Sequence, residues 1–118
     1  VNEINGRSVQ DQTAYASIAD FPCYRNLEGI KDTINDLAAR NVTNLKVTLE
    51  DIGDSYLKTQ NSAEGHDITV IKITGNGVTA PRTTEKGTVF AMFGIHAREY
   101  APPELGVRWA EMLVNGYG

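Results

Sequence analysis

The sequence predicts an α/β fold in which a mixed β-sheet is covered by helices, and three patterns carry that prediction. Residues 26–40 repeat apolar side chains at helical spacing, which indicates an amphipathic helix. Residues 45–50 alternate apolar and polar, and residues 68–73 are rich in β-branched side chains, as strands are. Residues 88–95 are apolar on both faces, which is typical of a strand in the middle of a sheet covered on both sides.

The first helix has recognisable ends. Asn26 is suited to the N-cap position, because its side chain can accept a hydrogen bond from a free backbone N–H, and Asn41 is expected to stop the helix. The predicted buried stripe comprises Leu27, Ile30, Ile34 and Leu37.

Two polar connections separate the predicted strands. Residues 53–67 are rich in Asp, Ser, Thr, Asn and Gly and predict a long irregular connection. Residues 75–87 contain Pro81 and no helical period, so they predict a second one. The strand at residues 45–50 is expected near a sheet edge, because only one of its faces is apolar.

A second helix follows the apolar strand. Pro102 and Pro103 suit the first turn of a helix, where a missing N–H costs nothing, and Glu104 suits the positive end of the helix dipole. Gly116 is a natural C-terminal cap. The predicted apolar stripe of this helix comprises Leu105, Trp109, Met112 and Leu113. Residues 93–105, FGIHAREYAPPEL, are therefore a strand-to-helix junction.

Composition excludes several classes of function. The chain has 118 residues, 41% of them hydrophobic, which predicts one globular unit. Its 11 basic and 15 acidic residues are scattered and give a net charge of −4, so nucleic acid is not an expected partner. No apolar run is long enough to span a bilayer, and the first residues have no signal-peptide core. The single cysteine, Cys23, cannot form an internal disulfide, and we expect it to be at least partly buried.

His96 and Glu99 lie just beyond the carboxyl end of the apolar strand, where ligands gather in open α/β sheets. In a turn, their spacing brings both side chains to one side, and nitrogen and oxygen donors suit zinc. Catalytic zinc normally has three protein ligands, so another ligand must come from elsewhere. An ordinary surface pair is the alternative reading. Arg98, between the two, is a solvated side chain or a group that binds an anion.

The run Gly94–Tyr100, GIHAREY, closely resembles the first zinc-binding signature of the M14 zinc carboxypeptidases, the family of carboxypeptidases A and B. Upstream, residues 49–56 resemble the family's I-G-x-S-Y turn, and residues 64–72 resemble its E-G-R-x-I-x-x-L-K strand. Residues 23–30 stand where the family begins its first helix. The departures from the family pattern are Tyr100 in place of tryptophan, an insertion at residues 57–63 and His66 in place of arginine.

The resemblance implies that His96 and Glu99 bind one Zn²⁺ ion and that Arg98 helps to bind the substrate, the C-terminus of a peptide or protein. The implied reaction is hydrolytic removal of the C-terminal amino acid. Residues 1–118 would form the N-terminal portion of a single catalytic domain, with the third zinc ligand and the general base beyond Gly118. The chain alone is then expected to be inactive. The resemblance places His66 away from the metal.

Two alternatives stay open at this point. An aspartoacylase-like zinc deacylase also uses His-x-x-Glu after a strand, but with glycine and asparagine where Ala97 and Arg98 stand. A non-catalytic scaffold or pseudoenzyme could keep the fold without the chemistry. The resemblance favours a secreted, extracellular protein, and Asn41 begins a glycosylation sequon.

Overall fold

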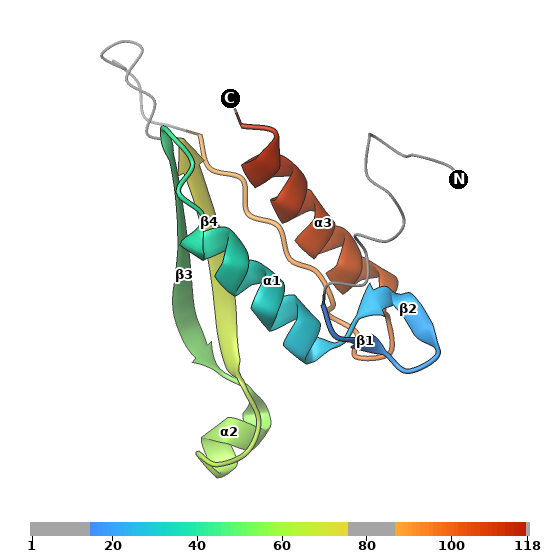
Figure 1. Ribbon diagram of the computed structural model, residues 1–118. Helices are drawn as coiled ribbons and strands as arrows, with labels where there is room; N and C mark the ends of the chain where they lie inside the picture. The colour runs from blue at the N-terminus through green and yellow to red at the C-terminus, as the bar shows by residue number, and fades with distance from the viewer. Residues whose placement is uncertain (1–14, 76–86, 118) are drawn as a thin grey trace.

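The computed structural model describes residues 15–75 and 87–117, and Figure 1 shows how they are arranged. In chain order, the elements are β1 (Ser17–Ile18), β2 (Phe21–Arg25), α1 (Leu27–Ala39), β3 (Leu45–Asp54), α2 (Tyr56–Gln60), β4 (Asp67–Gly75) and α3 (Ala101–Asn115). This combination of helices with small sheets confirms the α/β class.

The strands form two separate antiparallel pairs. β3 and β4 make a long ribbon whose register runs from Leu45 opposite Gly75 to Asp51 opposite Thr69 and then becomes irregular. β1 and β2 make a short hairpin beside the start of α1. Each described sheet has two strands, so the parallel pairings of a mixed sheet do not occur between the strands that the structure describes.

The core lies where α1 and α3 pack together against the β3–β4 ribbon (Figure 1). Leu37 of α1 and Val114 of α3 are almost fully buried, and Ala110 lies between them in the same cluster. The ribbon contributes its inner face. The partly buried side chains around the cluster are Val42, Leu45, Val47, Ile71 and Ile73.

The predicted ends of α1 are close to the observed ones. Asn26 is the N-cap, and its side-chain oxygen accepts a hydrogen bond of 2.9 Å from the Gly29 N–H, as expected. The helix ends at Ala39 with Arg40 as its C-cap, slightly earlier than predicted. Leu37 is buried as the stripe predicts, whereas Leu27 is exposed, because the buried face centres on Thr33 and Leu37.

The prediction that residues 53–67 are wholly irregular is wrong. β3 continues to Asp54, and the short helix α2 follows it. Two hydrogen bonds between Ser55 and His66 join the ends of this segment. The Ser55 N–H donates to the carbonyl of His66 at 2.8 Å, and the Ser55 Oγ accepts from the His66 N–H at 2.9 Å. Lys58 of α2 pairs with Asp54 and Asp67 at the ends of the two strands. Paired polar side chains thus order a segment whose composition suggests a loop.

The prediction of a buried central strand at residues 88–95 is also wrong. These residues form no strand, and most of their apolar side chains face solvent, with Val89 81% exposed and Ile95 68% exposed, whereas Phe93 packs against α3. A strand needs a neighbour to take its backbone N–H and C=O groups. None of the strands in the described residues pairs with this segment, so its sequence pattern alone does not make it a strand. Most of the polar connection before it, residues 76–86, lies outside the described residues.

α3 buries a different face from the predicted one. The predicted stripe is largely exposed, because Leu105, Met112 and Leu113 face solvent. Pro102 does stand in the first turn, and Gly116 caps the end, donating its N–H to the carbonyl of Met112 at 2.9 Å. The residues that α3 buries are Glu104, Val107, Ala110 and Val114.

The buried face of α3 also carries a charged residue, Glu104. Glu104 lies in the first turn of α3, as the dipole argument predicts, but it is only 7% exposed and accepts from Arg25. The Arg25 backbone N–H donates to Glu104 at 2.9 Å, and its guanidinium donates to Glu104 at 3.3 Å and to Glu111 at 3.0 Å. Arg108 adds a bond of 2.7 Å to the same Glu104 carboxylate. We call Arg25, Glu104, Arg108 and Glu111 the ion cluster.

Cys23 is exposed on β2, so the expectation that it is at least partly buried is wrong. β2 is covered by α1 and α3 only near Arg25, which leaves its beginning open to solvent. Among the described helices, none has both the length and the apolar character required to cross a membrane.

Glu104→Ala should lower the free energy of unfolding by about 1–3 kcal/mol, because it leaves the Arg25 backbone N–H without its acceptor and removes one of the two carboxylates that pair with the buried guanidinium. Urea denaturation followed by circular dichroism measures the change. Glu50→Ala is the control, since its pair with Lys72 is exposed and should be worth less than about 1 kcal/mol. Equal losses in the two variants would contradict the assigned importance of the ion cluster.

Tyr15 supplies a pH-dependent contribution to stability. Burial raises the pKa of its hydroxyl above 10.0, and the hydrogen bond of 2.8 Å to Asp36 and the negative charges of Asp36 and Glu111 raise it further. The neutral form is favoured in the folded state. The stability advantage over Tyr15→Phe should therefore be constant below about pH 10 and fall as the pH rises through the raised pKa. Denaturation curves of both proteins from pH 8 to 11.5 test this, and a difference independent of pH would contradict it.

Candidate functional site

His96 and Glu99 lie in one turn, which connects the segment 87–95 to α3. The Glu99 N–H donates to the His96 carbonyl at 3.1 Å and closes the turn. His96, Arg98 and Glu99 are all exposed. The structure therefore brings the two candidate metal ligands and the candidate substrate-binding arginine into a single turn that is open to solvent. We call residues 96–99 the metal turn.

The chain enters the metal turn through a conformation that requires glycine. Gly94 has a φ of 76°, and a Cβ on it would lie 2.8 Å from Cγ of Pro103. The preceding residue, Phe93, packs its ring against Gly106 of α3. A Cβ on Gly106 would come within 2.6 Å of that ring. Phe93 also meets Trp109 edge-on, with 6.2 Å between ring centroids. These contacts hold the entrance of the turn against the first half of α3.

The exit of the metal turn is held by aromatic contacts. Tyr100 follows Glu99 directly and stands at the N-cap position of α3. Its ring centroid lies 6.4 Å from that of Phe21 and 6.4 Å from that of Tyr24, both on β2. Tyr100 thus joins the exit of the metal turn to β2 through two aromatic contacts.

The donor atoms fit zinc in kind but not in number. An imidazole nitrogen and a carboxylate oxygen are both ordinary zinc ligands, and exposure leaves both accessible. Within residues 15–75 and 87–117, no group of three or more His, Cys, Asp or Glu side chains is placed to hold a metal ion. His66, the other histidine, is exposed at the junction of α2 and β4, where its backbone bonds to Ser55.

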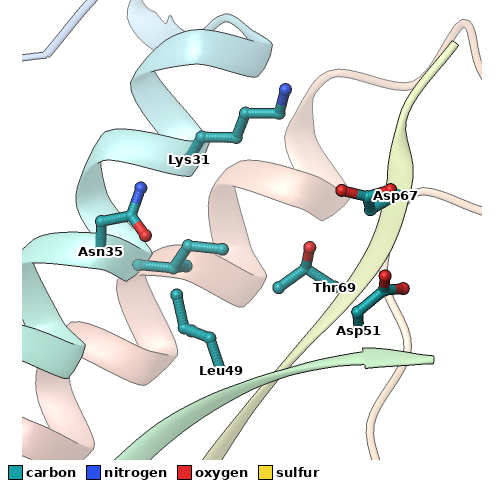
Figure 2. Close-up of a pocket in the computed structure, with 7 residues that line it drawn as sticks. Lys31, Asn35, Leu49, Asp51, Asp67 and Thr69 are labelled. Carbon is teal, nitrogen blue, oxygen red and sulfur yellow. The ribbon is translucent and has the colours of Figure 1, made fainter.

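A shallow pocket lies elsewhere, between α1 and the β3–β4 ribbon (Figure 2). Its volume is about 380 Å³, and neither the metal turn nor α3 lines it. Asp67 pairs with Lys58, Asp51 accepts from the Gly53 N–H, and Lys31 pairs with Glu28. Its charged groups thus already have partners within the protein. The lining residues are Lys31, Ile34, Asn35, Leu49, Asp51, Asp67 and Thr69.

The family model of the zinc carboxypeptidases, peptidase M14, matches residues 36–118, which is more than half of the chain. The chain belongs to the zinc carboxypeptidase family. The matched region contains the metal turn and α3, and it begins within α1. Searches of curated proteins and of solved structures found no significant match. Family membership agrees with the resemblance carried by the GIHAREY run.

The sequence of this member of the zinc carboxypeptidase family did not predict the contacts between β2 and the exit of the metal turn. Phe21, Tyr24 and Arg25 precede a helix N-cap and look locally like the edge of a small strand. Their partners, Tyr100 and Glu104, lie far along the chain. A cluster of aromatic and basic residues before a capped helix is a weak signal, and it does not indicate which distant residues the cluster contacts.

Gly94→Ala should lower the free energy of unfolding by about 1–3 kcal/mol, because alanine is strained at positive φ and its Cβ would collide with Pro103. Gly87→Ala is the matched control, since a Cβ there meets no atom within 4 Å. Thermal and urea denaturation of both variants measure the change. A Gly94→Ala protein as stable as Gly87→Ala would show that the close approach is not maintained in solution.

Proposed function

We propose that this chain belongs to a zinc-dependent carboxypeptidase, which removes C-terminal amino acids from peptides or proteins by hydrolysis. Family membership supports the reaction class. The single observation that carries the proposal is that His96 and Glu99 share one solvent-open turn whose two ends are held by packing. Two donors presented by a supported turn suit a metal ion that must stay accessible to a substrate.

In this proposal, His96 Nδ1 or Nε2 and the Glu99 carboxylate hold one Zn²⁺ ion. When bound, zinc supplies Lewis acidity, which polarises a carbonyl and lowers the pKa of a bound water. Arg98 is exposed and makes no ion pair with any residue that the structure describes, so its guanidinium is available to a carbonyl or carboxylate of the peptide. The substrate is the C-terminus of a peptide, and we propose that the protein works outside the cell.

The same proposal divides the site between this chain and residues outside it. The described residues offer two donors in the metal turn and no third donor nearby. We therefore propose that residues 1–118 form the N-terminal portion of one catalytic domain. The third zinc ligand and the general base then follow Gly118. This division explains an open, incomplete metal turn in a chain of this family.

Zinc titration tests the two-donor half of the proposal. The 118-residue chain should compete weakly with a chromophoric chelator for Zn²⁺, and His96→Ala or Glu99→Gln should abolish the competition. Arg98→Gln is the matched control and should leave the affinity within about twofold, because it keeps the turn and removes no donor. Equal zinc binding by the chain and by His96→Ala would contradict the assignment of the ligands.

Hydrolysis of a blocked dipeptide tests the reaction. We expect no turnover by the 118-residue chain and chelator-sensitive turnover by a protein extended through the downstream reading frame. In the extended protein, Arg98→Gln should lower kcat/KM by about 10- to 100-fold, the loss expected for a hydrogen bond to a charged group. Chelator-sensitive activity of the short chain would contradict the proposed division, and an inactive extended protein that still binds zinc would favour a scaffold.

A further inference from the structure

We infer that the β1–β2 hairpin positions the metal turn, with Phe21 and Tyr24 holding its exit and Arg25 holding the helix that follows. The inference rests on the proposed function only for its consequence, which is tighter binding of zinc. The hairpin precedes the region matched by the family model. Phe21, Tyr24 and Arg25 are positioning residues here, because they do not themselves bind the metal or the substrate.

The first link is aromatic. Tyr100 shares a peptide bond with Glu99, and its ring is in contact with Phe21 and Tyr24 at the same centroid distance, 6.4 Å, and the same interplanar angle, 48°. Phe21 is 51% exposed, so this contact buries little apolar area. A contact of this kind adds little to the stability of the whole fold and mainly restricts the backbone at the exit of the metal turn.

The second link is the ion cluster. The Arg25 backbone N–H and guanidinium both bond to Glu104, in the first turn of α3. Two bonds from two parts of one residue restrain both position and orientation, and the guanidinium is further held by Glu111. Because the side chains of Arg25 and Glu104 are each only 7% exposed, solvent competes little for these bonds. The start of α3 therefore cannot shift relative to β2 without breaking buried bonds.

The third link joins the start of α3 to the entrance of the metal turn. Pro103 lies beside Glu104 in the first turn of α3 and is in close contact with Gly94. The hairpin holds the start of α3, and the start of α3 holds Gly94. The hairpin therefore supports both ends of the metal turn, although the turn itself is exposed.

The consequence for binding is entropic. A turn that samples many conformations must be ordered when two of its side chains bind one ion. The conformational entropy that each residue loses lowers the affinity for the ion. A turn already held at both ends avoids most of that cost. The hairpin should therefore increase zinc affinity without contributing a ligand.

The experiment compares the double variant Phe21→Leu, Tyr24→Leu with the wild-type chain. Leucine keeps apolar bulk and removes the ring contacts with Tyr100. Amide hydrogen exchange of Glu99, measured by NMR without metal, should become about three- to tenfold faster, and Zn²⁺ affinity in the chelator competition should fall by a similar factor. Exchange of the Leu37 amide, in the core, should change much less than that of Glu99.

Two controls separate positioning from general loosening. Tyr56→Leu removes a ring that is 76% exposed on α2, far along the chain from the metal turn, and should leave Glu99 exchange unchanged. Phe21→Tyr, Tyr24→Phe restores aromatic rings at both positions and should restore both wild-type values. The single Phe21→Leu variant changes only an exposed residue and should show a smaller effect in the same direction, even if the double variant folds poorly.

Each outcome decides a different point. Unchanged Glu99 exchange in the leucine variants overturns the inference, even where the wild-type chain binds zinc. Equal acceleration at Glu99 and Leu37 also overturns it, because that pattern is global destabilisation. Faster Glu99 exchange in a chain that binds no zinc supports positioning by the hairpin and overturns the two-donor metal site.

Discussion

The buried bonds between Arg25 and Glu104 are the interaction on which the rest of this structure depends. Arg25 ends β2 and directly precedes the N-cap of α1, while Glu104 lies in the first turn of α3. One residue pair thus joins the hairpin, the start of α1 and the start of α3. A buried charge is costly unless it is paired, so α3 can turn its Glu104 face inward only because Arg25 lies beside it.

Much of the packing follows from that orientation. With Glu104 and Glu111 turned toward Arg25, Ala110 and Val114 meet Leu37 of α1 over the β3–β4 ribbon. The other apolar face of α3 and the segment 88–95 are left toward solvent, and together they expose several large hydrophobic side chains.

The metal turn shows how an exposed turn can be supported without being buried. His96 and Glu99 are exposed, as the proposed role of zinc ligands requires, while Gly94 and Tyr100 on either side are in contact with other parts of the protein. The packing contacts are made by the residues on either side of His96 and Glu99 and not by these two side chains. This arrangement accounts for a turn that is open to solvent yet defined at both ends.

The sequence by itself determined features that depend on neighbouring residues. Asn26 caps α1 and Gly116 caps α3 because a cap acts within one helical turn, and the GIHAREY run indicated the zinc carboxypeptidase family because its spacing is local. Of the candidate site, the sequence predicted that His96, Arg98 and Glu99 lie together between the apolar segment and α3, and the structure places them in one turn.

Only the tertiary structure decided which surfaces meet. α3 carries apolar residues on two faces, and its pattern does not say which one is buried. In the structure, the buried face is the one that carries Glu104, which pairs with Arg25, distant in sequence. Residues 88–95 have the composition of a central strand, but a strand forms only where neighbours accept its hydrogen bonds, and among the described residues no strand does so. The contacts of Phe21 and Tyr24 with Tyr100 are likewise a property of the fold, because they join residues that the sequence keeps far apart.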